Sequence, residues 1–405
     1  MHSKSLFAAV AVALFAGAWA SPVPDAPTEI DATTITEPPQ QNPDDVDQLA
    51  FDALQALQDL ESSSGTNKRS QTCTLRNVAV RRDWSSLSKN ERRSYIDAVL
   101  CLMELPSQID PNVVPGARSR YDDFVAVHIQ QTLTIHGTAN FLTWHRHYTW
   151  LFEQALRNEC GYTGYQPYWN WGASAANPLA SKVFDGSDYS LSGDGEYVPH
   201  NGSKIGGGQI AIPPGNGGGC VNSGPFKDMV VNLGPVSPTL DGVSKPTTGG
   251  GLLHNPRCLR RDISQYISSR WSTTSEIVRL IVTKFNILDF QNHMQGDFAN
   301  GFVGVHSAGH FTMGGDPGGD LFVSPGDPAF WVHHGMIDRV WWIWQNLNPL
   351  QRTYSVAGTI TINNNPPSRD GTLDDTINMG VLDPVDRTLR SLGSTLSGPY
   401  CYIYL

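Results

Sequence analysis

The chain has 405 residues, of which 40% are hydrophobic and 16% charged, and it contains 39 glycines and 27 prolines. This composition suits one large globular domain or two smaller ones, and it excludes collagen, coiled coils and wholesale disorder. The formal net charge is −10 and no cluster of lysine and arginine stands out, so we expect no nucleic-acid partner.

Residues 1–20 have the pattern of a signal peptide. Lys4 precedes an apolar run, and the run ends in Ala18-Trp19-Ala20, the small-x-small sequence typical of signal peptidase sites. The apolar run is too short and wrongly flanked to serve as a membrane anchor. We therefore predict a secreted, extracellular protein without a membrane anchor.

Residues 21–69 are interpreted as an acidic propeptide, with ten acidic residues against Lys68 and Arg69. Residues 21–43 are rich in proline, threonine and acid, which predicts disorder. Apolar residues at helical spacing predict one amphipathic helix over residues 46–60. The dibasic pair indicates a cut after Arg69, and a retained tail is the alternative. A leader helix could cover the site entrance until that cut, or it could only aid folding and secretion.

All six cysteines follow the predicted cut, and an even number in a secreted chain predicts three disulfides, with 15 possible pairings. Because no two cysteines approach CxxC spacing, we do not expect a thiolate metal site. Cys220 and Cys258 could staple the long glycine-rich loop near them. Asn201-Gly202-Ser203 is an acceptor sequence for N-glycosylation.

Residues 70–405 read as one mainly α domain with long loops and few short strands. Helical periodicity predicts helices at 89–104, 121–133, 144–158, 262–268, 274–285 and 328–346. Residues 174–251 form a long loop in this interpretation, and its glycine content from residue 201 onward makes regular structure unexpected there. Strand patterns are confined to 359–363 and 400–405.

Half of the twelve histidines fall into two triplets: His128, His136 and His145, and His306, His310 and His334. His306 and His310 are four residues apart, so their rings share one face if the segment is helical. The residues between them lack the glutamate of a HExxH zinc protease. Two all-nitrogen ligand sets without carboxylate or thiolate favour copper.

Two stretches of sequence carry a resemblance to a known family. Residues 136–146, with Thr149 and Glu153 beyond them, resemble the first copper signature of tyrosinases and catechol oxidases, and residues 327–338 resemble the second. Residues 167–169 resemble the family's Pro-Tyr-Trp element, followed by Asn170 where the family more often has Asp. Residues 402–404 resemble its closing Tyr-x-Tyr. The resemblance runs from residue 73 to the end, as in short secreted fungal polyphenol oxidases.

The resemblance implies a four-helix bundle that holds a type 3 dicopper centre, with O₂ as co-substrate and a small phenolic substrate. His128, His136 and His145 would hold one copper ion, and His306, His310 and His334 the other. The register of the second signature places the ligand at His334 rather than at its neighbour. Residues expected around the ligands, outside the metal's own coordination, are Asp297, Ser307, Phe311, His333 and Asp338.

Several neighbours of these ligands allow two interpretations. Asp338 lies one turn after His334 and could orient that ligand, or it could form a salt bridge with Arg146 or Arg339. His147 is expected to be a packing or surface residue. The tryptophans near the ligands could line the site or could simply pack in the core: Trp144, Trp331, Trp341, Trp342 and Trp344.

Departures from the family pattern narrow the expected activity. Thr134 stands where fungal relatives carry a cysteine linked to a ligand histidine, so we expect no thioether. Ser307 and Asp297 stand where relatives with strong monophenol hydroxylation carry an asparagine and a glutamate, and Phe311 could crowd an incoming ring. The sequence therefore favours oxidation of o-diphenols or o-aminophenols, with weak or selective monophenol hydroxylation, in pigment or secondary metabolism. The alternatives are a true tyrosinase monooxygenase, a haemocyanin-like oxygen carrier and a protein dedicated to one aromatic metabolite.

Overall fold

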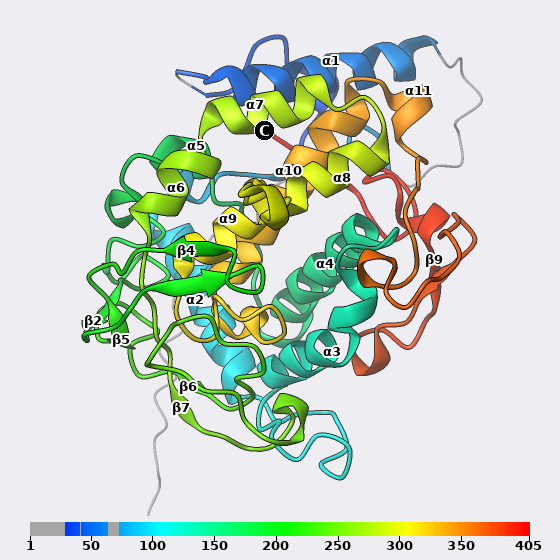
Figure 1. The fold of residues 1–405 in the computed structure, drawn as a ribbon. Coiled ribbons are helices and arrows are strands. Elements are labelled where there is room, and N and C mark those ends of the chain that lie inside the picture. Colours follow the sequence, from blue (N-terminus) through cyan, green and yellow to red (C-terminus); the bar gives the residue numbers. More distant parts are fainter. Residues whose placement is uncertain (1–28, 41, 64–72) are drawn as a thin grey trace, which may run out of the picture.

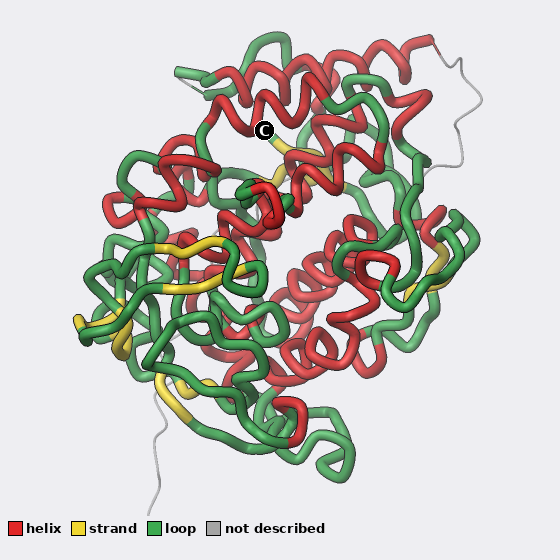
Figure 2. The backbone as a smooth tube through the Cα atoms, in the orientation of Figure 1, coloured by secondary structure: helices red, strands yellow, loops and turns green. Residues whose placement is uncertain are grey.

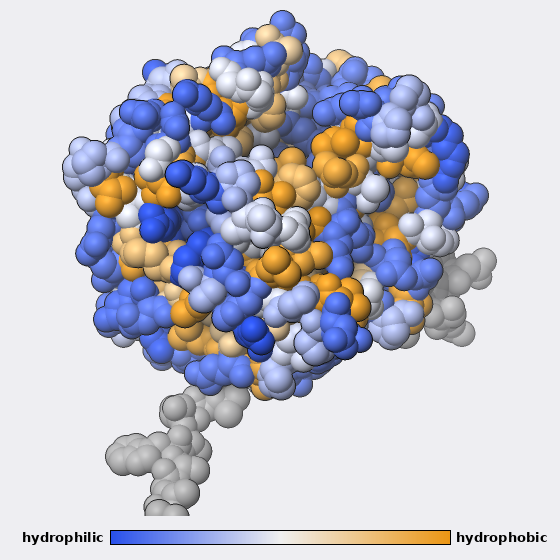
Figure 3. Space-filling model, turned by 60° about the horizontal axis from the view of Figure 1, so that its bottom comes forward, coloured by the Kyte–Doolittle hydropathy of each residue, from blue (hydrophilic) through white to orange (hydrophobic). Residues whose placement is uncertain are grey.

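The computed structural model describes residues 29–40, 42–63 and 73–405. The predicted signal peptide, residues 1–20, and the dibasic pair Lys68-Arg69 lie outside the described residues. Among the residues that are described, no helix has the length and apolar character needed to cross a membrane. On the face shown in Figure 3, hydrophobic side chains lie in small groups between hydrophilic ones.

Helices dominate the described chain and confirm the mainly α class (Figure 2). They are α1 (Asp45–Ser63), α2 (Lys89–Glu104), α3 (Arg120–Ile135), α4 (Phe141–Glu159), α5 (Trp171–Ser174), α6 (Gln265–Trp271), α7 (Thr274–Thr283), α8 (Ile287–Gln295), α9 (Gly304–Met313), α10 (Ala329–Asn346) and α11 (Pro349–Arg352). Every helix expected from periodicity is present. The helix α8 and the short helices α5 and α11 were not predicted, and α9 was expected only conditionally, from the spacing of two histidines.

Four of these helices, α3, α4, α9 and α10, surround the middle of the molecule (Figure 1). The helix α10 packs against both α4 and α9, and α3 packs against α4. Every residue of α10 is buried, including its last residue, Asn346, which is 8% exposed, because the helix runs through the core. Burial on every side is expected of a helix in such a central position.

The strands are short and form two-stranded ladders: β1 (Ala79–Arg81) with β10 (Tyr402–Tyr404), β2 (Gly195–Tyr197) with β5 (Gly218–Val221), β3 (Ser203–Ile205) with β4 (Ile210–Ile212), β6 (Val230–Val231) with β7 (Arg257–Cys258), and β8 (Thr376–Ile377) with β9 (Arg387–Thr388). The parallel β1–β10 pair confirms the strand expected at the C-terminal end of the chain.

The strand predicted at 359–363 is wrong. Thr359 makes only an isolated bridge to Asp370, and residues 362–364 form a 3₁₀ turn. Asn363 and Asn364 both have positive φ, which a strand cannot accommodate, and the two prolines that follow them lack the N–H groups that a ladder requires.

The expectation of little regular structure after residue 201 is also wrong. The hairpin β3–β4 contributes Ile205, Ile210 and Ile212 to a small apolar cluster with α6 and α9, separate from the main core. Burial of these side chains, which the glycine content concealed, stabilises the hairpin. The disulfide Cys220–Cys258 staples this region as expected.

The cysteines form three disulfides: Cys73–Cys401, Cys101–Cys160 and Cys220–Cys258. The number agrees with the sequence-based prediction, and no cysteine remains free. Cys73–Cys401 joins the start of the main domain to its last residues, beside the β1–β10 pair.

The predicted leader helix is present as α1, and it packs against α7 and α10 (Figure 1). Disorder was predicted for residues 21–43, but residues 29–40 are held in place. Ile30 forms a β-bridge with Val78, and the buried Ala32 donates its N–H to the Leu75 carbonyl. Backbone pairing with a segment more than 40 residues away, which composition does not reveal, orders this part of the leader.

Candidate metal centre

The first histidine triplet is brought together by α3 and α4. A capping box between Ser119 and Asp122 fixes the start of α3, which carries His128 near its middle and is followed directly by His136 as its C-cap residue. His145 lies one turn into α4. The three imidazole rings are buried, and their centroids are 5.0–5.8 Å apart.

Backbone carbonyls orient these three rings. Nδ1 of His128 lies 2.8 Å from the Phe322 carbonyl, Nδ1 of His136 lies 2.9 Å from that of Thr132, and Nδ1 of His145 lies 2.8 Å from that of Phe141. Because a carbonyl can only accept, each Nδ1 carries the proton and each Nε2 offers a lone pair. Nε2 of His128 and of His145 is buried without a partner among the described residues. The three histidines each offer a ring nitrogen within 4.8 Å of the other two, an arrangement that fits a metal ion.

The second group contains four histidines: His306 and His310 on α9, and His333 and His334 on α10. Their ligand atoms lie within 4.8 Å of one another, and Nε2 of His310 is 3.3 Å from Nε2 of His334. Because α9 is helical, the four-residue spacing places His306 and His310 on one face, as expected. The sequence had placed His333 outside the ligand set, and the structure brings its ring into the same cluster.

The two groups form one continuous centre. The rings of His145 and His334 stack with centroids 4.7 Å apart, and the His136 and His306 centroids are 6.1 Å apart. Each group consists of histidines alone, as the copper hypothesis requires. The donor set therefore fits two copper ions bound side by side.

Burial in this centre keeps the imidazoles neutral. Desolvation lowers the pKa of His136 to about 4 and that of His310 to about 3. It also lowers the pKa values of His128, His145 and His334 well below the usual value, and neighbouring histidines lower them further. A neutral imidazole is the form that binds a metal ion, so at neutral pH these histidines are in the form that can bind metal.

Asp338 forms a salt bridge with Arg146, one of the two partners proposed for it. Its Oδ1 accepts from Nε of Arg146 at 2.5 Å, and its Oδ2 accepts from the hydroxyls of Tyr402 and Tyr404 at 2.6 and 2.7 Å. Arg81 approaches the same carboxylate at 3.3 Å. Burial favours a higher pKa for Asp338, but the two guanidinium groups outweigh it and hold this pKa below its ordinary value. The Tyr-x-Tyr element thus closes a buried charge network.

Ser307 and Asp297 do not form a pair with each other. The Ser307 hydroxyl donates to the Gln295 carbonyl at 2.7 Å, whereas the exposed Asp297 accepts from the Asn300 amide at 2.7 Å. Gln295, which the sequence did not single out, also accepts from the backbone N–H of Gly137 at 2.7 Å, directly after His136. Its place at the end of the unpredicted helix α8 explains why no sequence signal revealed it.

Phe311 is half-buried in the apolar cluster with β3–β4 rather than free beside the ligands. Thr134 is exposed, and its hydroxyl donates to the Gln131 carbonyl. With every cysteine in a disulfide, no thiol is available for a thioether, in agreement with the expectation.

The role of Gly309 in the site was also not predicted from the sequence. A Cβ atom built on it would lie 2.1 Å from Cε1 of His333, so this glycine forms a notch in α9 that receives the His333 ring. A glycine inside an otherwise helical pattern was the available signal.

Most of the tryptophans belong to the core. Trp144 alone among the five named above contacts the rings of candidate ligands, with centroids 4.9 Å from His145 and 5.9 Å from His128. Trp331 stacks on Phe152 and Trp341 lies under Arg146. His147 is a buried packing residue that contacts Asp383 and Tyr400.

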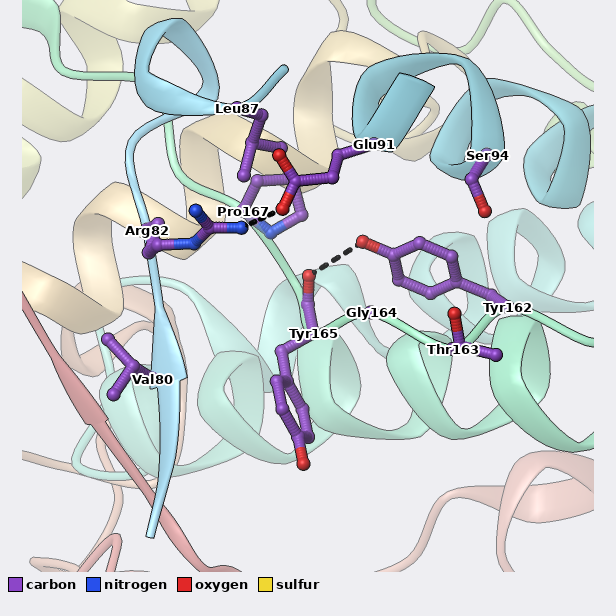
Figure 4. A pocket seen from close by; sticks show the side chains of 10 residues that line it. All are labelled: Val80, Arg82, Leu87, Glu91, Ser94, Tyr162, Thr163, Gly164, Tyr165 and Pro167. Carbon is purple, nitrogen blue, oxygen red and sulfur yellow. Dashed lines mark hydrogen bonds and ion pairs between the residues drawn. The ribbon is translucent and has the colours of Figure 1, made fainter. Parts of the chain in front are cut away.

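A separate small pocket between α2 and residues 162–167 is shown in Figure 4. Its polar groups satisfy one another: Arg82 pairs with Glu91, and the Tyr162 hydroxyl donates to the Tyr165 carbonyl. No histidine lines it, so it lies apart from the metal centre.

Comparison with known proteins agrees with this geometry. Residues 118–347, more than half of the chain, match the profile described as the common central domain of tyrosinase. The chain belongs to the tyrosinase family. Tyrosinase P of Aspergillus terreus is 43% identical over 331 residues, which cover 80% of this chain and 91% of that protein. N-acetyl-6-hydroxytryptophan oxidase of Emericella nidulans is 38% identical over 350 residues, which cover 82% and 94% of the two chains.

A solved structure shares the fold of this tyrosinase-family chain. The polyphenol oxidase from Thermothelomyces thermophila superposes with a TM-score of 0.84 and 42% sequence identity, and the match covers 90% of this chain and 99% of that one. The protein is accordingly a copper oxidoreductase of the type 3 class. This agreement confirms the family resemblance stated from the two signatures.

Proposed function

We propose that the protein is a secreted dicopper oxidase that uses O₂ to convert o-diphenols or o-aminophenols to quinone-type products, with weak or selective monophenol hydroxylation. The observation that carries this proposal is the pair of buried, all-histidine groups that meet at His145 and His334. Two copper ions bound there would supply the activation of O₂ and the acceptance of electrons from the phenolic ring.

The ligand assignment is part of the proposal. His128, His136 and His145 hold one copper ion, and His306, His310 and His334 hold the other. The short Nε2–Nε2 distance between His310 and His334 supports His334 as the third ligand, since two nitrogens on one ion lie at such a distance. The His333 ring instead lies in the Gly309 notch, with its centroid 5.2 Å from that of Trp171.

The preference for diphenols rests on the surroundings of Ser307. Hydroxylation of a monophenol requires a nearby group that accepts the phenol proton. Asp297, the carboxylate expected in that role, is exposed and bound to Asn300, and the Ser307 hydroxyl is directed at the Gln295 carbonyl. A catechol is more acidic and easier to oxidise, so it depends less on such a base. The name of the Emericella relative extends the set of plausible substrates to hydroxyindoles.

Secretion is supported by the signal-peptide pattern and by three disulfides, which persist in oxidising compartments. Asn201 is exposed, as a glycosylation site must be. A secreted oxidase of this kind would act on small aromatic metabolites, including pigment precursors.

The test is oxygen uptake by copper-loaded protein with catechol, 2-aminophenol, tyrosine and a 6-hydroxyindole. We expect about two copper ions per chain and a near-ultraviolet absorption band when hydrogen peroxide is added. His136→Ala or His310→Ala should abolish the band, and His254→Ala, at an exposed histidine, should leave it unchanged.

Other outcomes would select the alternatives. One copper ion per chain, or full activity with zinc, would contradict the dicopper assignment. The absorption band without turnover of any phenol would indicate an oxygen carrier. Equal rates on tyrosine and catechol without a lag would indicate a true tyrosinase, and turnover of one aromatic metabolite alone would indicate a dedicated enzyme.

A further inference from the structure

The leader helix α1 packs closely against the main domain, which is not expected of a propeptide that is removed. One face of α1 is acidic and solvent-facing, and the other is buried: Val46, Ala50, Phe51, Ala53, Leu54 and Leu57. Figure 1 shows α1 lying lengthwise against α7, and α1 also packs against α10. Loss of this helix would expose the apolar surfaces of both partners to water.

A buried ion pair joins α1 to the helix that carries His333 and His334. Oδ1 of Asp47 lies 2.6 Å from Nη2 of Arg339, and the two side chains are 9% and 0% exposed. Nε and Nη1 of Arg339 are buried without a hydrogen-bond partner among the described residues, and the Tyr168 ring covers the guanidinium at 4.6 Å. Without Asp47, Arg339 would retain a buried positive charge with no salt-bridge partner in the described chain, which is strongly unfavourable.

Two further sets of hydrogen bonds hold the leader. Thr274, at the start of α7, donates its hydroxyl to Oδ2 of Asp44 at 3.1 Å. The Gln58 amide donates to the carbonyls of Ala32 and Ile35 and so ties α1 to the segment before it, which contains a 3₁₀ turn at Ala32–Thr34. That segment in turn pairs with Val78 through Ile30. The leader is therefore anchored to the main domain at α7, at α10 and at residue 78.

We propose that residues 29–63 are a permanent, non-covalently held part of the mature protein, and that they stay docked on α7 and α10 after any cut following Lys68-Arg69. All six cysteines follow the dibasic pair, so no disulfide would retain the cut segment. The apolar face of α1 and the Asp47–Arg339 pair hold it instead. The mature protein would then consist of two chains, and its leader would stabilise α10.

The test begins with folded protein expressed from Ser21, in which residues 66–69 are replaced by the recognition sequence of a site-specific protease. After folding and copper loading, the chain is cut, and size exclusion with native mass spectrometry determines whether the two fragments remain together. We expect co-elution, with copper content and catechol turnover within about twofold of the uncut protein. Cutting after folding avoids the need for the main domain to fold alone.

Two matched variants test the contact itself. Asp47→Asn should weaken retention of the cut leader by about a hundredfold, measured by dilution, because it leaves Arg339 unpaired. Asp59→Asn removes the same charge from an exposed position on the same helix and should have little effect. Release of the unmodified leader after the cut would overturn the proposal. Equal retention in both variants would overturn the role of the ion pair.

Discussion

Asp338→Asn is the sharpest perturbation of the network that supports the metal centre. The carboxylate lies on α10, four residues after His334, and it is the shared partner of Arg81 and Arg146, both with fully buried side chains. The substitution keeps the size of the side chain and removes the charge. Arg81 retains Glu153 as a partner at 3.0 Å, but Arg146 has no other salt bridge among the described residues.

The expected loss of stability is large because one member of a buried ion pair is removed. Such changes cost about 3–5 kcal/mol, and the hydrogen bonds that Asn can still accept place the expected value near the lower limit, about 3 kcal/mol. The tyrosine hydroxyls also lose a charged acceptor, for which hydrogen bonds are stronger than for a neutral one.

The effect should depend on pH in a defined direction. In the folded protein the pKa of Asp338 is lowered below its ordinary value, so its stabilising contribution is complete above the unfolded pKa of about 3.9 and is lost as the pH falls through the folded pKa. The difference in unfolding free energy between the wild type and Asp338→Asn should therefore be full at pH 7 and shrink below about pH 4.

The assay is urea-induced unfolding of the metal-free protein with its disulfides intact, at several pH values. Asp374→Asn is the control, because Asp374 pairs with Arg390 at the surface and is 81% exposed, so its loss should cost less than about 1 kcal/mol. A change of less than about 0.5 kcal/mol for Asp338→Asn at pH 7 would refute this reasoning. Unchanged stability with loss of copper would show instead that Asp338 acts on the proposed ligand His334.

Three further predictions follow from the centre. Gly309→Ala should lower the unfolding free energy by about 1–3 kcal/mol and weaken copper retention against a chelator, because the added methyl group meets the His333 ring; unchanged copper retention would show that the notch does not position α9. In the wild type, we expect the rate of tyrosine turnover to be at most about one tenth of the rate of catechol turnover, which corresponds to a difference of roughly 1.4 kcal/mol in barrier height. Ser307→Asn should raise this ratio, and steady-state rates on the two substrates would show whether it does. The metal-free protein should lose stability as the pH falls below about 6.5. In the unfolded state the histidines bind protons in this range, whereas in the folded state the buried histidines, with their lowered pKa values, do not. An unfolding free energy that stays constant between pH 7 and pH 5 in urea titrations would contradict this prediction.

Local sequence patterns were sufficient to predict most of the longer helices and the candidate metal ligands of this protein. The helices at 89–104 and 328–346 were predicted within one residue of their observed bounds, since the periodicity of burial repeats within each helix. His136, His145 and His334 lie within the two short signatures, and a four-residue spacing pointed to His306 and His310. The number of disulfides followed from an even count of cysteines in a chain with a predicted signal peptide.

Tertiary structure decided the contacts between residues distant in sequence. The Phe322 carbonyl that orients His128 is 194 residues away, and Arg339 is 292 residues from Asp47. His333 and His334 are adjacent in sequence, yet their different places depend on the notch at Gly309 on another helix. Cysteine pairing and the ordering of residues 29–40 likewise depend on which surfaces meet. Periodicity records that a side chain is buried, whereas the identity of its neighbours is set only when the helices pack.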